Sequence, residues 1–389
     1  MRIGKWARLA LAVAPLLAGC KGFWNAPVTP VTPTPTTLSS GHFYVLNTAK
    51  NEIAGFYVNA GAVTALPGSP YALSAAPIAI TVAPNNAFLD VSTLGGIFVY
   101  TINSDGGLTL GNSSQAISSD PAVSMQVDTT NSWLIEGVSG AANLFAIHIN
   151  STTGVLASTT EQTAVLPATT VQQVAIAPDD SSVFVAMGSG GTAVIPFTST
   201  NANPLGKVST IGVKNASGAA LSVAVDPGTS TTTTPRLLYI GETVATSGSN
   251  SGGLRVFNYS TLQEITGSPY AVSGLAPYSI LPFSTGDFVY VVNRQVSGSS
   301  SGVIAGFSIS ETNNAFALTA LGSTFAAGIN PQALVEDNTK AFVFAVDFGG
   351  TPDLVGYTID GTNAGYLDTV VSAATGTDPV QASAIAAAH

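Results

Sequence analysis

Short runs of β-branched, aromatic and small residues recur along the chain from residue 42 onward, and each run ends in turn-forming residues. Representative runs are FYVLN at 43–47, SVFVAM at 182–187 and FVYVVN at 288–293. Runs of four to eight such residues between clusters of Gly, Pro, Asn and Asp predict β-strands joined by tight turns. The 40 Gly and 22 Pro residues also favour short strands over long helices.

A strand that continues into a hairpin turn repeats seven times, at intervals of 44 to 60 residues. The first copy is AGFYVNAGAVTAL at 54–66, and the last is VGYTIDGTNAGYL at 355–367. The seven copies share one apolar column, which consists of Phe56, Tyr100, Ile147, Phe197, Phe257, Phe307 and Tyr357. Each unit contains four predicted strands. Because a single four-stranded unit cannot bury both of its faces, units of this period are expected to pack together as propeller blades.

The two ends of the repeat region predict how the ring closes. The region begins with HFYVLN at 42–47, which matches the second strand of a unit, and ends with PVQASAIAAA at 379–388, which matches an innermost strand. We therefore expect an all-β, seven-bladed β-propeller of four-stranded antiparallel blades, closed by pairing of the N- and C-terminal strands. The predicted blades are 42–76 with 379–388, 78–120, 122–169, 171–219, 221–276, 278–330 and 332–378. Two β-sandwiches in tandem are the alternative, although nothing in a sandwich requires a constant period.

The first twenty residues have the features of an export signal. Arg2, Lys5 and Arg8 form a basic segment, and the apolar run at 9–18 is too short to span a bilayer. The string LAGC at 17–20 resembles the lipobox of bacterial lipoproteins. An ordinary secretory signal with an incidental Cys, or an uncleaved anchor, is the alternative.

The lipobox resemblance implies that the chain is cut before Cys20 and that Cys20 is lipidated. We accordingly predict a signal peptide at 1–19, a lipidated Cys with a Pro- and Thr-rich tether at 20–41, and the propeller at 42–389. In extended form, the sixteen residues at 26–41 would reach on the order of 50 Å at about 3.1 Å per residue. The expected location is the cell envelope, where the protein is anchored to a membrane on the periplasmic or outer-membrane side.

Charged residues are scarce, with 11 Lys and Arg against 21 Asp and Glu. Removal of residues 1–19 would leave 8 basic and 21 acidic residues, a net charge of −13. This balance excludes nucleic acid as a partner, because nucleic-acid binding needs a clustered basic surface. The single Cys excludes an intrachain disulfide and a Cys-based zinc cluster.

Two motifs connect the chain to a known family. YVLN at 44–47 and YVVN at 290–293 resemble the YVTN repeat, and the blade pattern is similar to the seven-bladed propellers of the lactonase family, which includes 6-phosphogluconolactonase. Members typically carry Pro-Arg-His at the start of an innermost strand. The corresponding positions here lack Arg and His, and read Pro77-Ile78-Ala79, Pro121-Ala122-Val123, Pro277-Tyr278-Ser279, Pro331-Gln332-Ala333 and Pro379-Val380-Gln381. This departure argues against 6-phosphogluconolactonase activity.

Candidate binding residues follow from the topology, because second strands end and innermost strands begin on the same face of the disc. We expect polar residues at these positions to ring the mouth of a central channel. The candidates are Asn47, Glu136, Gln173, Glu242, Asn293, Arg294, Gln332 and Asp347, with Gln172, Tyr278 and Gln381 nearby. The alternative is that they are ordinary polar loop tips.

Several chemistries are compatible with these residues. A lactone hydrolase would use one of the three carboxylates as a base and Arg294 as an oxyanion donor. Carboxylate and Asn oxygens would suit Ca²⁺, but no ligand spacing supports a metal site, and we predict neither a cofactor nor a metal. The expected function is that of a monomeric binding module for a small ligand, glycan or protein. The alternatives are a hydrolase of a neutral lactone or ester, and a structural cell-envelope protein.

Overall fold

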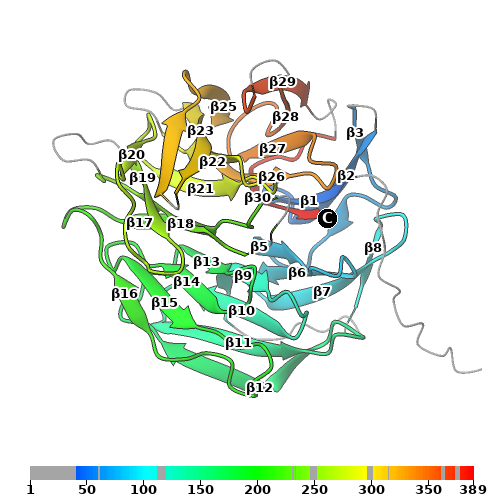
Figure 1. Cartoon of the computed structure of the whole chain (residues 1–389). Coiled ribbons are helices and arrows are strands. Elements are labelled where there is room, and N and C mark those ends of the chain that lie inside the picture. The colour runs from blue at the N-terminus through cyan, green and yellow to red at the C-terminus, as the bar shows by residue number, and fades with distance from the viewer. Residues whose placement is uncertain are drawn as a thin grey trace, which may run out of the picture.

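The apolar runs form strands that pair into seven antiparallel sheets, arranged in a ring (Figure 1). The computed structural model describes residues 41–59, 62–111, 120–229, 232, 234–245, 252–295, 301–313, 315–360, 364–372 and 377–389. In these ranges every regular element is a strand. The described residues contain no helix that is long and apolar enough to cross a membrane. The predicted signal peptide, Cys20 and nearly all of the tether lie outside the described residues.

Each blade is numbered here by its order from the N-terminus, and its strands are given from the innermost outward. The first blade contains β30 (Ala382–Ala388), β1 (His42–Asn47), β2 (Glu52–Asn59) and β3 (Ala62–Ala65), with β4 (Tyr71–Ala72) also on β2. The second contains β5 (Pro77–Val82), β6 (Phe88–Thr93), β7 (Gly96–Ile102) and β8 (Leu108–Leu110). The third contains β9 (Ala122–Val127), β10 (Trp133–Val138), β11 (Asn143–Ile149) and β12 (Leu156–Val165).

The remaining blades follow the same order around the ring. The fourth contains β13 (Gln173–Ile176), β14 (Ser182–Ala186), β15 (Thr192–Pro196) and β16 (Ser209–Ile211). The fifth contains β17 (Ala220–Val225), β18 (Leu237–Glu242), β19 (Gly253–Asn258) and β20 (Tyr270–Ala271). The sixth contains β21 (Pro277–Pro282), β22 (Phe288–Asn293), β23 (Ser301–Thr312) and β24 (Ala315–Ala320), with β25 (Phe325–Ile329) also on β23. The seventh contains β26 (Pro331–Glu336), β27 (Phe342–Asp347), β28 (Leu354–Ile359) and β29 (Leu367–Ser372).

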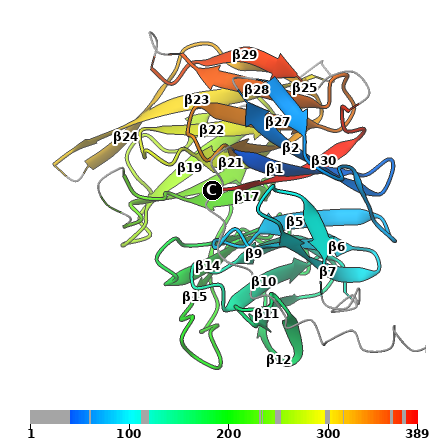
Figure 2. The same cartoon turned by 90° about the vertical axis from the view of Figure 1, so that its right-hand side faces the viewer.

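The predicted closure of the ring is confirmed. β30 pairs antiparallel with β1, with Phe43 opposite Ala387 and Val45 opposite Ile385. Figure 2 shows the ring from the side, with the red β30 alongside the blue β1. The C-terminal strand therefore supplies the innermost strand of the first blade, and the sheet edge of β1 is covered.

The four-strand rule needs one refinement, because the first and sixth blades each carry a fifth strand. In both blades the extra strand pairs with the third strand beyond the end of the fourth, so it extends the outer edge.

The phrase GSPYA, which occurs at 68–72 and 267–271, forms the same local structure twice. Its Tyr-Ala pair makes β4 in the first blade and β20 in the fifth.

Alternating side chains of each second strand pack into two different cores. Phe43 and Val45 face the seventh blade, where Phe43 stacks on Phe344 with ring centres 4.4 Å apart. Tyr44 and Leu46 face the second blade. A strand buried on both faces in this way connects two neighbouring inter-blade cores, so each blade is stabilised by the blades on both sides.

The tyrosines of YVLN and YVVN have an inter-blade role. The hydroxyl of Tyr44 donates to the carbonyl of Gly106 at 2.7 Å, and that of Tyr290 donates to the carbonyl of Gly365 at 2.9 Å. Both glycines lie in the outer hairpin turn of the next blade and have positive φ. The motif thus fixes the first and sixth blades to the turns of their neighbours, which gives it a structural role in these blades.

The glycine in the hairpin turn of the third blade also has a packing requirement. Gly154 has φ of +69°, and a Cβ at this position would overlap the ring of Phe88 in the second blade. Glycine is therefore needed for two reasons, the left-handed backbone and the close approach of the aromatic ring.

Candidate functional site

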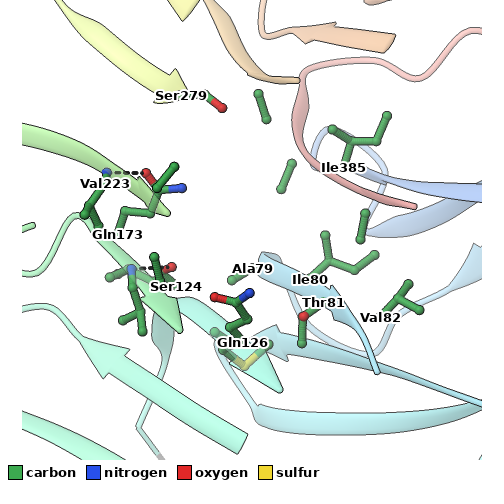
Figure 3. Close-up of a pocket in the computed structure, with 18 of the residues that line it drawn as sticks. Ala79, Ile80, Thr81, Val82, Ser124, Gln126, Gln173, Val223, Ser279 and Ile385 are labelled. Carbon is green, nitrogen blue, oxygen red and sulfur yellow. Dashed lines mark hydrogen bonds between the residues drawn. The ribbon is translucent and has the colours of Figure 1, made fainter. Parts of the chain in front are cut away.

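The seven innermost strands surround a central cavity of about 520 Å³. Its lining combines small apolar side chains with uncharged polar ones, and Figure 3 shows Gln126, Gln173, Ser124 and Ser279 among them. Gln172, Gln332 and Tyr278 line the cavity where innermost strands begin. Among the described residues that line it, none is an Asp, Glu, Lys or Arg. The described wall is therefore polar but carries no Asp, Glu, Lys or Arg side chain, and it includes the imidazole of His389.

Several of the polar side chains join neighbouring innermost strands. Gln126 Oε1 accepts a hydrogen bond from the backbone N–H of Ile176 at 2.7 Å. Gln173 Oε1 accepts one from the N–H of Val223 at 3.0 Å, which Figure 3 shows as a dashed line. These bonds satisfy N–H groups on the inner edges of the fourth and fifth blades, which no further strand covers. Because the oxygens are engaged, the two amide groups offer the channel mainly their N–H donors.

Arg294 lies at the rim of the channel, one residue beyond the end of β22. Its guanidinium carbon is 3.0 Å from the centre of the Tyr278 ring, and its Nη2 donates to Gln332 Oε1. The side-chain nitrogen of Gln332 in turn donates to the carbonyl of Asn330 at 2.7 Å. Burial lowers the pKa of Arg294. The structure thus brings together three of the residues expected at the mouth, Arg294, Tyr278 and Gln332, with Gln173 farther inside.

The other five candidates are placed differently from the expectation, because they lie between blades rather than in the channel lining. They are 0–3% exposed and comprise Asn47, Glu136, Glu242, Asn293 and Asp347. Each shares its strand face with residues packed on the preceding blade, as Asn47 does with Phe43 and Val45. Side chains alternate along a strand, so this face is directed sideways and not toward the central axis.

Two of these buried residues, Glu242 and Asn293, form hydrogen bonds that hold neighbouring blades together. Glu242 Oε1 accepts a hydrogen bond from Arg255 Nη1 at 2.7 Å, and its Oε2 accepts one from the N–H of Lys214 in the fourth blade at 2.8 Å. Asn293 donates to the carbonyl of Val272 in the fifth blade at 2.9 Å. Such bonds fasten the end of a second strand to the preceding blade, and they leave these groups turned away from any ligand in the channel.

Asp347 is a carboxyl group in an unfavourable environment. It is fully buried, and burial together with the negative charges of Asp353 and Asp378 raises its pKa to about 7. Asp353 accepts hydrogen bonds from backbone N–H groups, including that of Gln381 at 2.6 Å. Within the described ranges, no group of three or more His, Cys, Asp or Glu side chains is arranged to hold a metal ion.

Two polar residues inside the channel, Ser124 and Gln126, were not among the sequence candidates. Ser124 and Gln126 alternate with Met125 and Val127 on β9, and this period-two pattern on an innermost strand was the available signal. Arg255, the partner of Glu242, was also missed. It lies in the middle of a third strand, where no sequence pattern distinguishes it.

Comparisons with known structures agree with the architecture. A candidate 6-phosphogluconolactonase from Bacteroides uniformis is 14% identical over 90% of this chain and 99% of its own, with a TM-score of 0.69. The periplasmic gluconolactonase PpgL of Pseudomonas aeruginosa is 15% identical over 90% of this chain and 99% of its own, with a TM-score of 0.64. Comparison of the sequence with protein-family models and with curated proteins gave no match. The predicted resemblance to lactonase-type propellers is thus confirmed for the fold.

Proposed function

We propose that the protein is an exported, lipid-anchored binding module whose central channel takes a small polar ligand. The observation that carries this proposal is the separation of the carboxylates from the channel. Glu136, Glu242 and Asp347, the candidate bases of a lactonase, are buried between blades. The described wall of the channel consists of amides, hydroxyls, apolar groups and the imidazole of His389. A general base must reach the water or the ligand that it activates, and the three carboxylates do not line the cavity.

The size and polarity of the channel suit a small ligand. A cavity of about 520 Å³ lies within the usual range of ligand pockets. Amide N–H donors of Gln126 and Gln173 and the hydroxyls of Ser279 and Ser383 line it, so a ligand with several hydroxyl or carbonyl oxygens would find partners. Export is supported by the signal-like N-terminus and by the fold shared with a periplasmic protein of Pseudomonas aeruginosa.

Hydrolysis of a neutral lactone is the second candidate, because the structural neighbours include a gluconolactonase. The experiment that separates the two combines ligand binding and turnover. Thermal melts of the purified protein are recorded with polyols, monosaccharides, sugar acids and lactones, and lactone hydrolysis is followed in parallel. A bound ligand raises the melting temperature in proportion to its excess over Kd.

Two matched variants locate the binding. Gln172→Trp places a bulky side chain at the channel lining, whereas Thr169→Trp makes the same change at an exposed position three residues earlier. The proposal expects the ligand-induced shift to disappear in Gln172→Trp and to persist in Thr169→Trp. Catalytic turnover of a lactone would establish the hydrolase instead. The absence of any shift in the unmodified protein would refute the binding module and favour a structural envelope protein.

A further inference from the structure

Arg294 differs from Arg236 and Arg255, the other two arginines among the described residues, in its lack of an acidic partner. Arg236 donates to Asp226 at 2.8 Å, and Arg255 forms ion pairs with Glu242 and Glu264. Within the described part of the chain, no carboxylate lies within ion-pair distance of Arg294. The sequence contains almost twice as many acids as bases, so an unpaired arginine is unexpected on grounds of number alone.

The neighbours of Arg294 are neutral. The ring of Tyr278 covers one face of the guanidinium, and Gln332 accepts a hydrogen bond from Nη2. The Nε atom is buried and has no acceptor in the described structure. A partly buried cation without a counterion loses hydration that neutral groups restore only in part. An anion within hydrogen-bond reach of the guanidinium would restore it more fully.

The position of the side chain links it to the channel. Tyr278 and Gln332 are themselves part of the channel lining, so Arg294, which contacts both and is partly exposed, lies beside the lining at the rim. Beyond the rim, the described lining has no Asp, Glu, Lys or Arg, and neutral polar groups such as those of Gln173 and Ser279 face the cavity. A ligand that extends from the rim into the channel would therefore meet one positive charge first and neutral hydrogen-bonding groups afterwards.

We propose that Arg294, Tyr278 and Gln332 form a carboxylate-binding site at the mouth of the channel, and that the ligand is a small hydroxylated monocarboxylate. The planar fork of an arginine matches a carboxylate, which accepts two parallel N–H bonds. A single guanidinium in a protein of net negative charge favours a monoanion over a dianion such as a phosphate monoester. The hydroxyl groups of the ligand would lie against the amides and serines farther inside. This inference rests on the proposed function.

Isothermal titration calorimetry on the full-length protein tests the inference with two matched ligands, gluconate and sorbitol. They have similar hydroxylated bodies and differ at the end that carries the carboxylate. We expect gluconate to bind at least about tenfold more tightly than sorbitol, as loss of a hydrogen-bonded charge contact implies. Arg294→Gln should abolish this preference and leave sorbitol affinity unchanged. Arg294→Lys should retain part of it, because lysine keeps the charge but lacks the fork.

Controls keep the outcomes distinct. Lys207→Gln removes one positive charge from an exposed site and should leave the preference intact. Melts without ligand verify that each variant is folded. Equal affinity for the two ligands in the unmodified protein, equal gluconate affinity in Arg294→Gln, or binding of neither ligand would overturn the inference. Sorbitol binding that Gln172→Trp abolishes, without any preference for gluconate, would sink the carboxylate site while leaving the channel-binding proposal standing.

Discussion

Asp347→Asn is expected to stabilise the protein at alkaline pH and to have no such benefit at acidic pH. Asp347 ends β27, is fully buried, and has a pKa raised to about 7 by burial and by the nearby Asp353 and Asp378. Its ordinary value is 3.8. A raised pKa means that the carboxylate of Asp347 binds a proton more tightly in the folded protein than in the unfolded chain. Stability therefore falls as the pH rises from about 4 to about 7, and it stays reduced above that range.

The size of the effect follows from the two pKa values. The difference between about 7 and 3.8 is roughly 3, which corresponds to about 4 kcal/mol at 1.36 kcal/mol per pKa unit. Asn is nearly isosteric with protonated Asp and carries no charge at any pH. The free energy of unfolding of the variant, minus that of the unmodified protein, should therefore increase by about 4 kcal/mol between pH 4 and pH 8.5.

Urea unfolding at pH 4, 5, 6, 7 and 8.5 measures this difference. The comparison of two proteins is essential, because buried Asp90 in the second blade also has a pKa raised to about 7 and adds its own pH dependence to both curves. Asp368→Asn, at an exposed position on β29 of the same blade, is the control and should show no increase. A gain for Asp347→Asn that is equal at pH 4 and pH 8.5, or that shrinks as the pH rises, would refute the reasoning.

Two further predictions concern the contacts between blades. Gly154→Ala should destabilise the protein by about 1–2 kcal/mol more than Gly140→Ala, because both glycines have positive φ but only the first would place its Cβ against Phe88. Equal urea midpoints for the two variants would contradict this. Tyr290→Phe should cost about 1–2 kcal/mol, since it leaves the buried carbonyl of Gly365 without its donor. An unchanged midpoint would show that the inter-blade bond contributes nothing.

The fold was predictable because its repeating unit is local. The aligned column of the hairpin lies on or directly after the third strand of every blade, from Phe56 on β2 to Tyr357 on β28. The unmatched ends at 42–47 and 379–388 likewise predicted the pairing of β1 with β30. Both inferences need only strand periodicity and the requirement that sheet edges be covered.

The candidate site was harder to predict, because the face of the disc is set by topology but the direction of each side chain is set by register. Asn47 lies on the expected face, yet it points sideways with Phe43 and Val45 toward the seventh blade. The same alternation directs Asp347 toward the sixth blade. Arg294 reaches the rim because it lies one residue beyond the strand, where the alternation ends. Its contact with Tyr278 depends on how two blades pack, which no pattern within one strand reveals.

The strand that completes the first blade is the last of the described strands in chain order, so it is made after the other six blades. His42 and Ala388, which face each other across β1 and β30, are 346 residues apart in the sequence. Until β30 emerges from the ribosome, β1 has no inner partner, and the core between the first and seventh blades is incomplete. Contacts between such distant segments also form slowly. Such late closure is compatible with the export that the N-terminal segment predicts, because a ring that still lacks β30 has not yet locked its first blade to its seventh.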